Sequence, residues 1–441
     1  MKKKYPLSDL KISPRAKAYV NKVLNSNRLS YGPFTEKYES LFAKIHNRKF
    51  AIITNSGTSG LQVAIHALKE TYQWEDQDEV IVPAITFIAS SNVILHNNLR
   101  PVFVDVEPDH FCIDPTKIEE NITKRTKAIM PVHLFGQSAN MGSVVKIAKK
   151  HNLKIVEDSC EAMFVKYKGT PVGSLGDVSV YSTYIAHIIT TGVGGIVTTN
   201  DEALATMIKS LNFHGRDNIY LKMEDDDTKD KMRLNSLIER RFQFIHVGYS
   251  YRLTEMESAL GLAELERKNK IVEQRKAVGE SIVKALSEFS DFFQLPHPRE
   301  YAEHIYMLFP IVIMDPQIDR DEFLLYLEEN GVETRLFMPL LTQPIYKKIF
   351  GDIEDKFPVA KMLVERGFII GSHPYLTRDQ IKYLAGLFRN YLSDVNNNTK
   401  FVIKWEREID KYSKKEIIHE LASKDAQIQK LKGKNEKILE K

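Results

Sequence analysis

Four short apolar segments, each separated from the next by a helical segment, constrain the fold of this chain most strongly. They are residues 79–82, 100–104, 128–131 and 154–156. Strands that are apolar on both faces and alternate with helices are typical of a parallel sheet with helices on both sides. We therefore expect an α/β domain built around such a sheet.

The segments on either side of this core divide the chain into three predicted parts. Ser13 followed by Pro14 predicts a helix over 14–29, because a hydroxyl cap and an early proline favour a helix start. Further helices are expected over 33–46, 61–68 and, as one or two long helices, 252–286. A smaller α+β unit follows, with predicted strands at 304–314 and 331–336 and predicted helices at 320–330, 358–366 and 380–392. The predicted domains are 1–255, 256–395 and a tail at 396–441.

The tail differs in character from the rest of the chain, because it is polar and charged. Its apolar residues fall at heptad spacing, at Leu421, Ile428, Leu431 and Ile438. Such a short pattern predicts a helix or a coiled coil between subunits, and a solvated, partly disordered extension is the alternative.

Composition excludes several classes of function. The net charge is only +4 from 62 basic and 58 acidic residues, so no nucleic-acid partner is expected. The two cysteines, Cys112 and Cys160, cannot supply the four thiolates of an iron–sulfur cluster, and no metal site is expected. No apolar run is long enough to span a membrane, and no apolar segment follows the basic N-terminus. We expect a cytoplasmic protein.

Residues 180–195 hold the candidate catalytic groups. A short alternating run carries Ser182, His187 follows five residues later, and a glycine cluster closes the stretch. On its own this pattern also fits a buried histidine beside a structural turn.

Three other segments could bind a ligand. The loop 55–59 lies between a strand and a helix start, where free backbone N–H groups suit a phosphate, although a plain helix cap gives the same pattern. Glu157 and Asp158 end a buried strand, at the sheet edge where such folds bind ligands, and we expect one of the two to point to solvent. Phe87 follows another strand, where it could stack on a flat cofactor or belong to the core.

Together these segments carry motifs that resemble one enzyme family. They include Asn55-Ser-Gly-Thr-Ser-Gly-Leu61, Val156-Glu-Asp158, Gly173-Ser-Leu-Gly-Asp177, Thr190-Thr-Gly-Val-Gly-Gly195 and Gly248-Tyr-Ser-Tyr-Arg252. Over about residues 5–392 the chain is similar to the DegT/DnrJ/EryC1/StrS family of nucleotide-sugar enzymes, which are fold type I pyridoxal phosphate enzymes. The resemblance implies a large domain with a mainly parallel seven-stranded sheet, a smaller C-terminal α+β domain, a helical tail outside the resemblance and a homodimer.

The resemblance also implies which residues hold the cofactor phosphate. Gly57 and Thr58 match the phosphate loop, and Ser182 matches a serine that donates to the phosphate. Ser250 stands where an asparagine of the neighbouring subunit usually reaches the same phosphate.

The ring of the cofactor has three implied partners. Phe87 matches the aromatic residue that stacks on the pyridine ring, and Asp158 matches the acid that pairs with the pyridinium nitrogen. Glu161 falls near the ring hydroxyl, where aminotransferases of the family usually carry glutamine.

His187 occupies the position at which the family's aminotransferases carry the lysine that binds the cofactor covalently. This exchange resembles the family's sugar 3-dehydratases, which hold pyridoxamine phosphate without a covalent bond. The resemblance implies removal of the C3 hydroxyl of a nucleotide-linked 4-keto-6-deoxy sugar, with L-glutamate as amino donor, in deoxysugar and cell-surface polysaccharide (O-antigen) biosynthesis. His187 would be the catalytic base, since an imidazole accepts protons near neutral pH. Alternatives are an aminotransferase that works without the lysine and a non-catalytic member that binds cofactor or nucleotide sugar.

Overall fold

The computed structural model describes residues 3–217, 230–240 and 242–409. The chain forms two compact units, the first ending at Leu384 and the second beginning at Ala385. The first unit contains every candidate site residue. The heptad positions of the tail, from Leu421 to Ile438, lie outside the described residues, so their role stays a prediction, as do the domain bounds at 255 and 395.

A seven-stranded sheet forms the centre of the first unit, in the order β1-β9-β8-β5-β4-β2-β3. The pairs β2–β3, β2–β4, β4–β5 and β5–β8 are parallel, whereas β9 is antiparallel to both β1 and β8. The predicted, mainly parallel seven-stranded sheet is confirmed. Its strands are β1 (Phe50–Thr54), β2 (Glu79–Pro83), β3 (Arg100–Val104), β4 (Thr126–Ile129), β5 (Lys154–Asp158), β8 (Val178–Ser182) and β9 (Gly195–Thr199).

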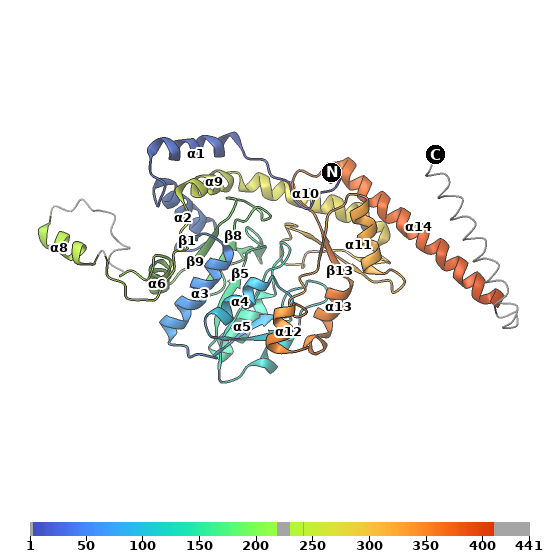
Figure 1. Ribbon diagram of the computed structural model, residues 1–441, viewed down its shortest axis with the longest axis horizontal. Coiled ribbons are helices and arrows are strands. Elements are labelled where there is room, and N and C mark those ends of the chain that lie inside the picture. The colour runs from blue at the N-terminus through green and yellow to red at the C-terminus, as the bar shows by residue number, and fades with distance from the viewer. Residues whose placement is uncertain (1–2, 218–229, 241, 410–441) are drawn as a thin grey trace, which may run out of the picture. The chain divides into compact units, whose positions relative to one another are not determined.

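Both faces of this sheet are buried. Val80 and Val82 belong to one core cluster, whereas Ile81 between them belongs to the other, because side chains alternate across a strand. The first cluster takes in helices α3 (Gly57–Tyr72), α4 (Ile88–His96) and α6 (Glu202–Asn212), and the second takes in α2 (Pro33–Ile45) and α5 (Met141–His151). Helices therefore cover both faces, as the apolar strands predict (Figure 1).

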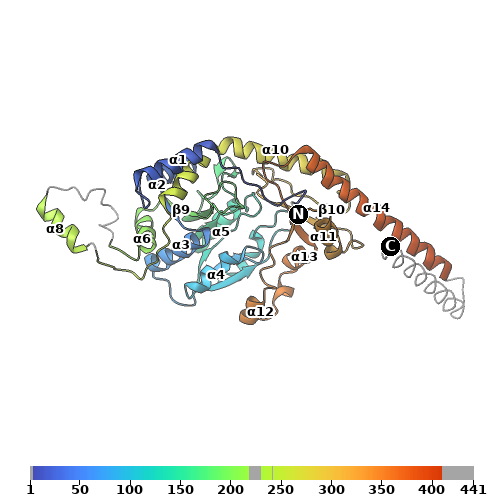
Figure 2. The same cartoon turned by 45° about the horizontal axis from the view of Figure 1, so that its top comes forward.

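The N-terminal helices begin where the sequence predicts. In α1 (Pro14–Ser26) the Ser13 side chain accepts a hydrogen bond from the N–H of Ala16, and the helix ends earlier than predicted because Asn27 takes a left-handed conformation, with φ 57°. Helix α1 lies along α9 (Glu255–Leu265), which is followed at once by α10 (Lys268–Leu286) (Figures 1 and 2). The predicted long helical region at 252–286 is thus two successive helices.

A second, antiparallel sheet has the order β10-β11-β13-β12. Its strands are β10 (Phe293–Gln294), β11 (Phe309–Ile313), β12 (Thr334–Leu336) and β13 (Gly367–Ile370), and its helices are α11 (Arg320–Glu329), α12 (Pro344–Phe350) and α13 (Pro358–Arg366). The predicted strand at 304–314 is too long at its start. Residues before Phe309 form a turn in which Tyr306 has a φ of 49°, a value that a strand does not allow.

The remaining elements are short or peripheral. Strands β6 (Lys166–Tyr167) and β7 (Thr170–Pro171) form a hairpin, and α8 (Lys231–Arg240) lies in the irregular region predicted at 217–240, of which residues 218–229 lie outside the description. Helix α14 (Arg378–Ile409) begins in the first unit and continues into the second. In the described ranges 3–217, 230–240 and 242–409, every helix is too short or too polar to cross a membrane.

Candidate active site

A cavity of about 420 Å³ lies at the carboxyl edge of the central sheet, beyond the ends of β5 and β8. Parallel α/β sheets bind ligands at this edge. The cavity brings together seven of the eight candidate residues, which are Gly57, Thr58, Phe87, Asp158, Glu161, Ser182 and His187. These residues come from four separate segments of the chain, which the fold brings to one cavity, and their roles stay a prediction.

One end of the cavity suits a phosphate group. The Ser56 side chain caps helix α3 by accepting from the N–H of Ser59, and Gly57 and Thr58 open the first turn, whose N–H groups have no partner within the helix. A side chain at residue 57 would meet Cβ of Ser182 at 2.9 Å and Sγ of Cys160 at 3.0 Å. The glycine therefore lets the helix start approach the buried Ser182 hydroxyl closely.

The cavity lining also carries a carboxylate and an aromatic ring. Asp158 ends β5, and its Oδ2 accepts a hydrogen bond of 2.7 Å from the Ser90 hydroxyl, while its Oδ1 accepts from the N–H of Cys160 at 3.2 Å. Phe87 precedes α4 and is 59 % exposed, which is unusual for a phenylalanine and fits a ring that stacks on a bound group. A cationic ring nitrogen would find a fixed, buried counter-charge at Asp158.

Glu161 is buried beside Asp158. Burial raises the pKa of its carboxyl group to about 7, and the negative charge of Asp158 adds to this rise. The N–H of Phe135, which donates to Oε2 at 2.8 Å, lowers the pKa in part. Near neutral pH the Glu161 carboxyl group is therefore protonated in some molecules and ionised in others. It can donate a proton in the first form and accept one in the second.

His187 lies in the loop between β8 and β9 and lines the cavity from the side. The loop is closed at its base, because the N–H of Thr183 donates to the Gly194 carbonyl at 2.9 Å and the two threonine hydroxyls at 183 and 191 are 2.7 Å apart. Burial, reinforced by the nearby Arg275 charge, lowers the pKa of His187 to about 4. The imidazole is thus neutral at physiological pH and can accept a proton.

The cavity has no amine that could replace the family's lysine. Among the residues that the structure describes, no lysine lines it. Lys166 and Lys168, which are near in sequence, belong to the β6–β7 hairpin, where Lys168 lies over the ring of Tyr301 at 5.0 Å. The role of His187 at the position of the family's lysine stays a prediction.

Ser250 does not join the other candidates. It is exposed and lines a second cavity with Leu29, Tyr31 and Arg252, where the Arg252 guanidinium donates to its hydroxyl at 3.0 Å. Its predicted contact with the phosphate requires a neighbouring subunit, so that contact stays a prediction.

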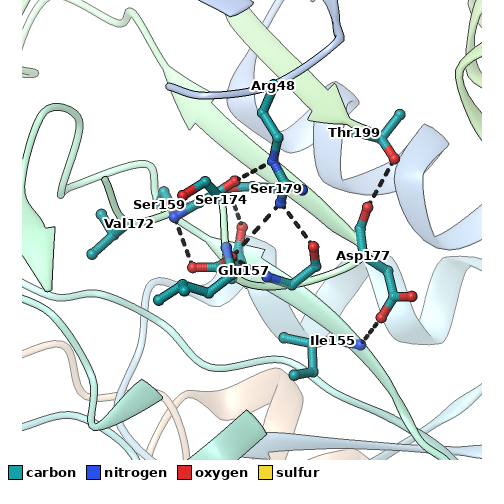
Figure 3. Close-up of polar contacts among 12 residues, drawn as sticks. Arg48, Ile155, Glu157, Ser159, Val172, Ser174, Asp177, Ser179 and Thr199 are labelled. Atoms are coloured by element: carbon teal, nitrogen blue, oxygen red, sulfur yellow. Dashed lines mark hydrogen bonds and ion pairs between the residues drawn. The ribbon is translucent and has the colours of Figure 1, made fainter. Parts of the chain in front are cut away.

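Glu157 departs from the sequence prediction, because neither acid at the end of β5 points to solvent. The Glu157 carboxylate is fully buried and accepts hydrogen bonds from the N–H groups of Gly173, Leu175 and Gly176, at 2.5 to 2.8 Å (Figure 3). Arg48 lies 3.8 Å away and binds the carbonyls of Gly173 and Gly176. These contacts hold the pKa of Glu157 below its ordinary value despite burial, with His133 as the largest favourable partner. Glu157 thus anchors the strand end that carries Asp158.

Several residues of the cavity were not predicted. The Ser90 hydroxyl donates a hydrogen bond to Asp158, which is 68 residues away in the sequence. Met307, Leu308 and Met338 add apolar side chains to the lining of the cavity. No local pattern marks these residues, because their role depends on long-range packing.

The sheet order, the helix start at Gly57 and the acid at the end of β5 are those of the fold type I enzymes of the pyridoxal phosphate class. The model of the DegT/DnrJ/EryC1/StrS aminotransferase family matches residues 11–389, so the chain belongs to this family. Membership confirms the predicted family, its fold and its pyridoxal phosphate cofactor.

Two relatives of known name show the range of reactions in the family. The GDP-perosamine synthase of Escherichia coli O157:H7 is 32% identical over 398 residues, covering 88% of this chain and 99% of the relative. The dTDP-4-dehydro-2,6-dideoxy-D-glucose 3-dehydratase of Saccharopolyspora spinosa is 31% identical over 371 residues, covering 81% and 80%. Among solved structures, E. coli GDP-4-keto-6-deoxy-D-mannose-3-dehydratase with bound hydrated PLP has a TM-score of 0.79 at 24% identity, over 88% of this chain and 100% of that one. The last similarity is one of fold.

Proposed function

We propose that this chain is a pyridoxamine-phosphate-dependent dehydratase that removes the C3 hydroxyl of a nucleotide-linked 4-keto-6-deoxy sugar. The observation that carries the proposal is a neutral histidine, His187, in a cavity whose described lining contains no lysine. The 3-dehydratase relative from Saccharopolyspora spinosa supports the reaction type.

The residues of the cavity suit a non-covalently held cofactor. Gly57, Thr58 and Ser182 would hold its phosphate, Phe87 would stack on its ring, and Asp158 would keep the ring nitrogen protonated. When bound, pyridoxamine phosphate supplies an amine for the sugar carbonyl and a ring that accepts electrons. Without a covalent bond, these contacts alone must position it.

His187 moves the proton in this proposal. Its Nδ1 is buried without a hydrogen-bond partner among the described residues, which leaves Nε2 as the nitrogen able to face a bound molecule. Nε2 accepts a proton from carbon and, once protonated, donates it to the C3 hydroxyl as that group leaves as water.

The complete reaction requires an amino donor, and we propose L-glutamate. The sugar loses one oxygen, while glutamate becomes 2-oxoglutarate and releases ammonia, so atoms and electrons balance. We further propose that the enzyme works as a homodimer in the cytoplasm, with Ser250 of each subunit directed to the other's phosphate site, and that its product enters cell-surface polysaccharide (O-antigen) biosynthesis.

Aminotransfer to the same sugar is the second candidate, favoured by the similarity to GDP-perosamine synthase. The two reactions differ in their nitrogen product. Dehydration releases one ammonia for each 2-oxoglutarate, whereas aminotransfer leaves the nitrogen on the sugar and the C3 hydroxyl in place.

The test is to incubate the purified protein with pyridoxamine phosphate, glutamate and a nucleotide-linked 4-keto-6-deoxyhexose, and to measure ammonia, 2-oxoglutarate and sugar mass. We expect equal amounts of ammonia and 2-oxoglutarate, and a sugar that has lost one oxygen. An amino sugar without free ammonia would establish aminotransfer, and no turnover with several nucleotides would favour a binding role. H187K, loaded with pyridoxal phosphate, should form an imine between its lysine amine and the cofactor aldehyde with loss of water, and should suppress ammonia release. The control K168A should retain wild-type turnover because Lys168 lies in the β6–β7 hairpin.

A further inference from the structure

Arg275 in helix α10 is buried, with 5 % of its surface exposed, and it binds main-chain carbonyls from three separate segments. Its Nη1 donates to the carbonyls of Met307 at 3.2 Å and Ser372 at 3.1 Å, and its Nη2 donates to the carbonyl of His187 at 3.3 Å. One guanidinium group therefore connects α10, the turn before β11, the segment after β13 and the loop that carries the candidate base.

The charge of Arg275 is not neutralised by a carboxylate. Within the part of the chain that the structure describes, no Asp or Glu carboxylate acts on the Arg275 charge, and its Nε has no hydrogen-bond partner. Burial lowers the pKa of Arg275 to about 10, so the group remains a cation at neutral pH. Burying an unpaired cation is costly, and three carbonyls compensate for only part of that cost.

This cation lies close to His187, whose carbonyl it binds. Both residues line a small cavity, and His187 also lines the candidate cofactor cavity. The titratable and charged side chains that line the small cavity with His187 are Asp9, Glu264, Arg275, His373 and Tyr375, and those that line the cofactor cavity with it are Asp158, Cys160, Glu161 and Tyr184. Of these groups, Arg275 is the one whose charge acts on the imidazole, in the same direction as burial.

We propose that Arg275 is a positioning residue for His187: its guanidinium fixes the main chain of the loop, and its charge disfavours protonation of the imidazole. The proposal rests on the role of His187 in the proposed function. It assigns to Arg275 two separable effects, one geometric and one electrostatic. A lysine can keep the charge but cannot bind three carbonyls with a planar fork of donors, and a glutamine removes the charge.

Two variants of Arg275 and one matched control test the proposal. R275K isolates the geometric effect, and R275Q removes both effects. The control is R366Q, because Arg366 also donates to main-chain carbonyls, those of Ile313 and Asp315, at the end of β11. In each protein the His187 ring is titrated by NMR without added cofactor, with its signal assigned by loss in H187N. The kcat and KM for ammonia release are measured with cofactor.

We expect R275Q to raise the pKa of His187 by about one unit, as removal of a nearby like charge does. R275K should leave that pKa unchanged and lower kcat by about tenfold with little change in KM, because a displaced base loses rate rather than affinity. R366Q should change neither quantity. If R275Q and R366Q titrate like the wild type and both R275 variants keep the wild-type kcat, Arg275 is only a structural residue and the proposal is wrong. If R275Q does not fold, R275K decides through kcat. The titration needs no turnover, so a protein without dehydratase activity can still confirm or overturn the electrostatic effect.

Discussion

Replacing Glu157 by glutamine should strongly destabilise the protein. In the native carboxylate, Oε1 accepts from the N–H groups of Leu175 and Gly176, and Oε2 accepts from the N–H of Gly173. In glutamine one of these oxygens becomes an NH₂ group, so at least one buried N–H donor faces another donor. An unsatisfied buried donor costs about 1–3 kcal/mol, and breaking the buried pair with Arg48 costs about 3–5 kcal/mol. These costs overlap, and we expect a loss of about 3–5 kcal/mol in the free energy of unfolding.

Urea unfolding at neutral pH, followed by circular dichroism and by fluorescence, measures this loss. E119Q is the matched control, because Glu119 pairs with Lys150 and His151 on the surface and should leave the unfolding midpoint unchanged. A second signature is acid sensitivity. Because the folded pKa of Glu157 is depressed, its contribution is present above the ordinary carboxyl pKa and is lost as pH falls through the folded pKa. If E157Q unfolds at the same urea concentration as E119Q, the assignment of Glu157 as the anchor of β5 is wrong.

Three further predictions concern the cavity itself. D158N should lower kcat by about a hundredfold or more, because the ring nitrogen loses its charged partner. The rate of ammonia release at saturating substrate measures kcat. An unchanged kcat would contradict the pairing of Asp158 with the ring nitrogen. F87A should weaken cofactor binding by about tenfold through loss of stacking, measured by fluorescence titration, and equal affinity would show that the exposed ring does not stack. E161Q should flatten the pH dependence of the melting temperature. The folded pKa of Glu161 is raised from 4.5 to about 7, so the wild type loses stability as pH rises through this window, and E161Q should not.

The parts of this fold that could be predicted from the sequence are those fixed by local chemistry. The apolar strands of the large sheet, the Ser13 cap and the loop at Gly57 each follow from a few neighbouring residues. The strand predicted over 304–314 was wrong over residues 304–308, because tertiary contacts turn the chain there, with the N–H of Met307 donating to the Phe135 carbonyl. Propensity gives no information about such contacts.

The candidate site shows the same limit. The motifs marked Asp158, Ser182 and His187, which line one cavity, but they gave no sign of the residues that support them. Arg275 contacts His187 across 88 positions and Ser90 contacts Asp158 across 68. Nor could the environment of the two acids be predicted, since two adjacent carboxylates on one strand end can both be buried only when the fold supplies separate donors for each.

The presence of histidine where aminotransferases carry lysine does not by itself determine the reaction, because the result depends on what surrounds the imidazole. A lysine can reach several atoms of a bound molecule through its long flexible side chain, whereas an imidazole reaches only as far as its main chain allows. In this structure that main chain is held on both sides: the His187 N–H donates to the Tyr184 carbonyl, and the His187 carbonyl accepts from Arg275. A base held in this way can return a proton only to an atom close to the one that released it. Loss of a hydroxyl on a neighbouring carbon requires only such a short proton transfer. We therefore expect dehydration because of the closed loop as much as because of the histidine.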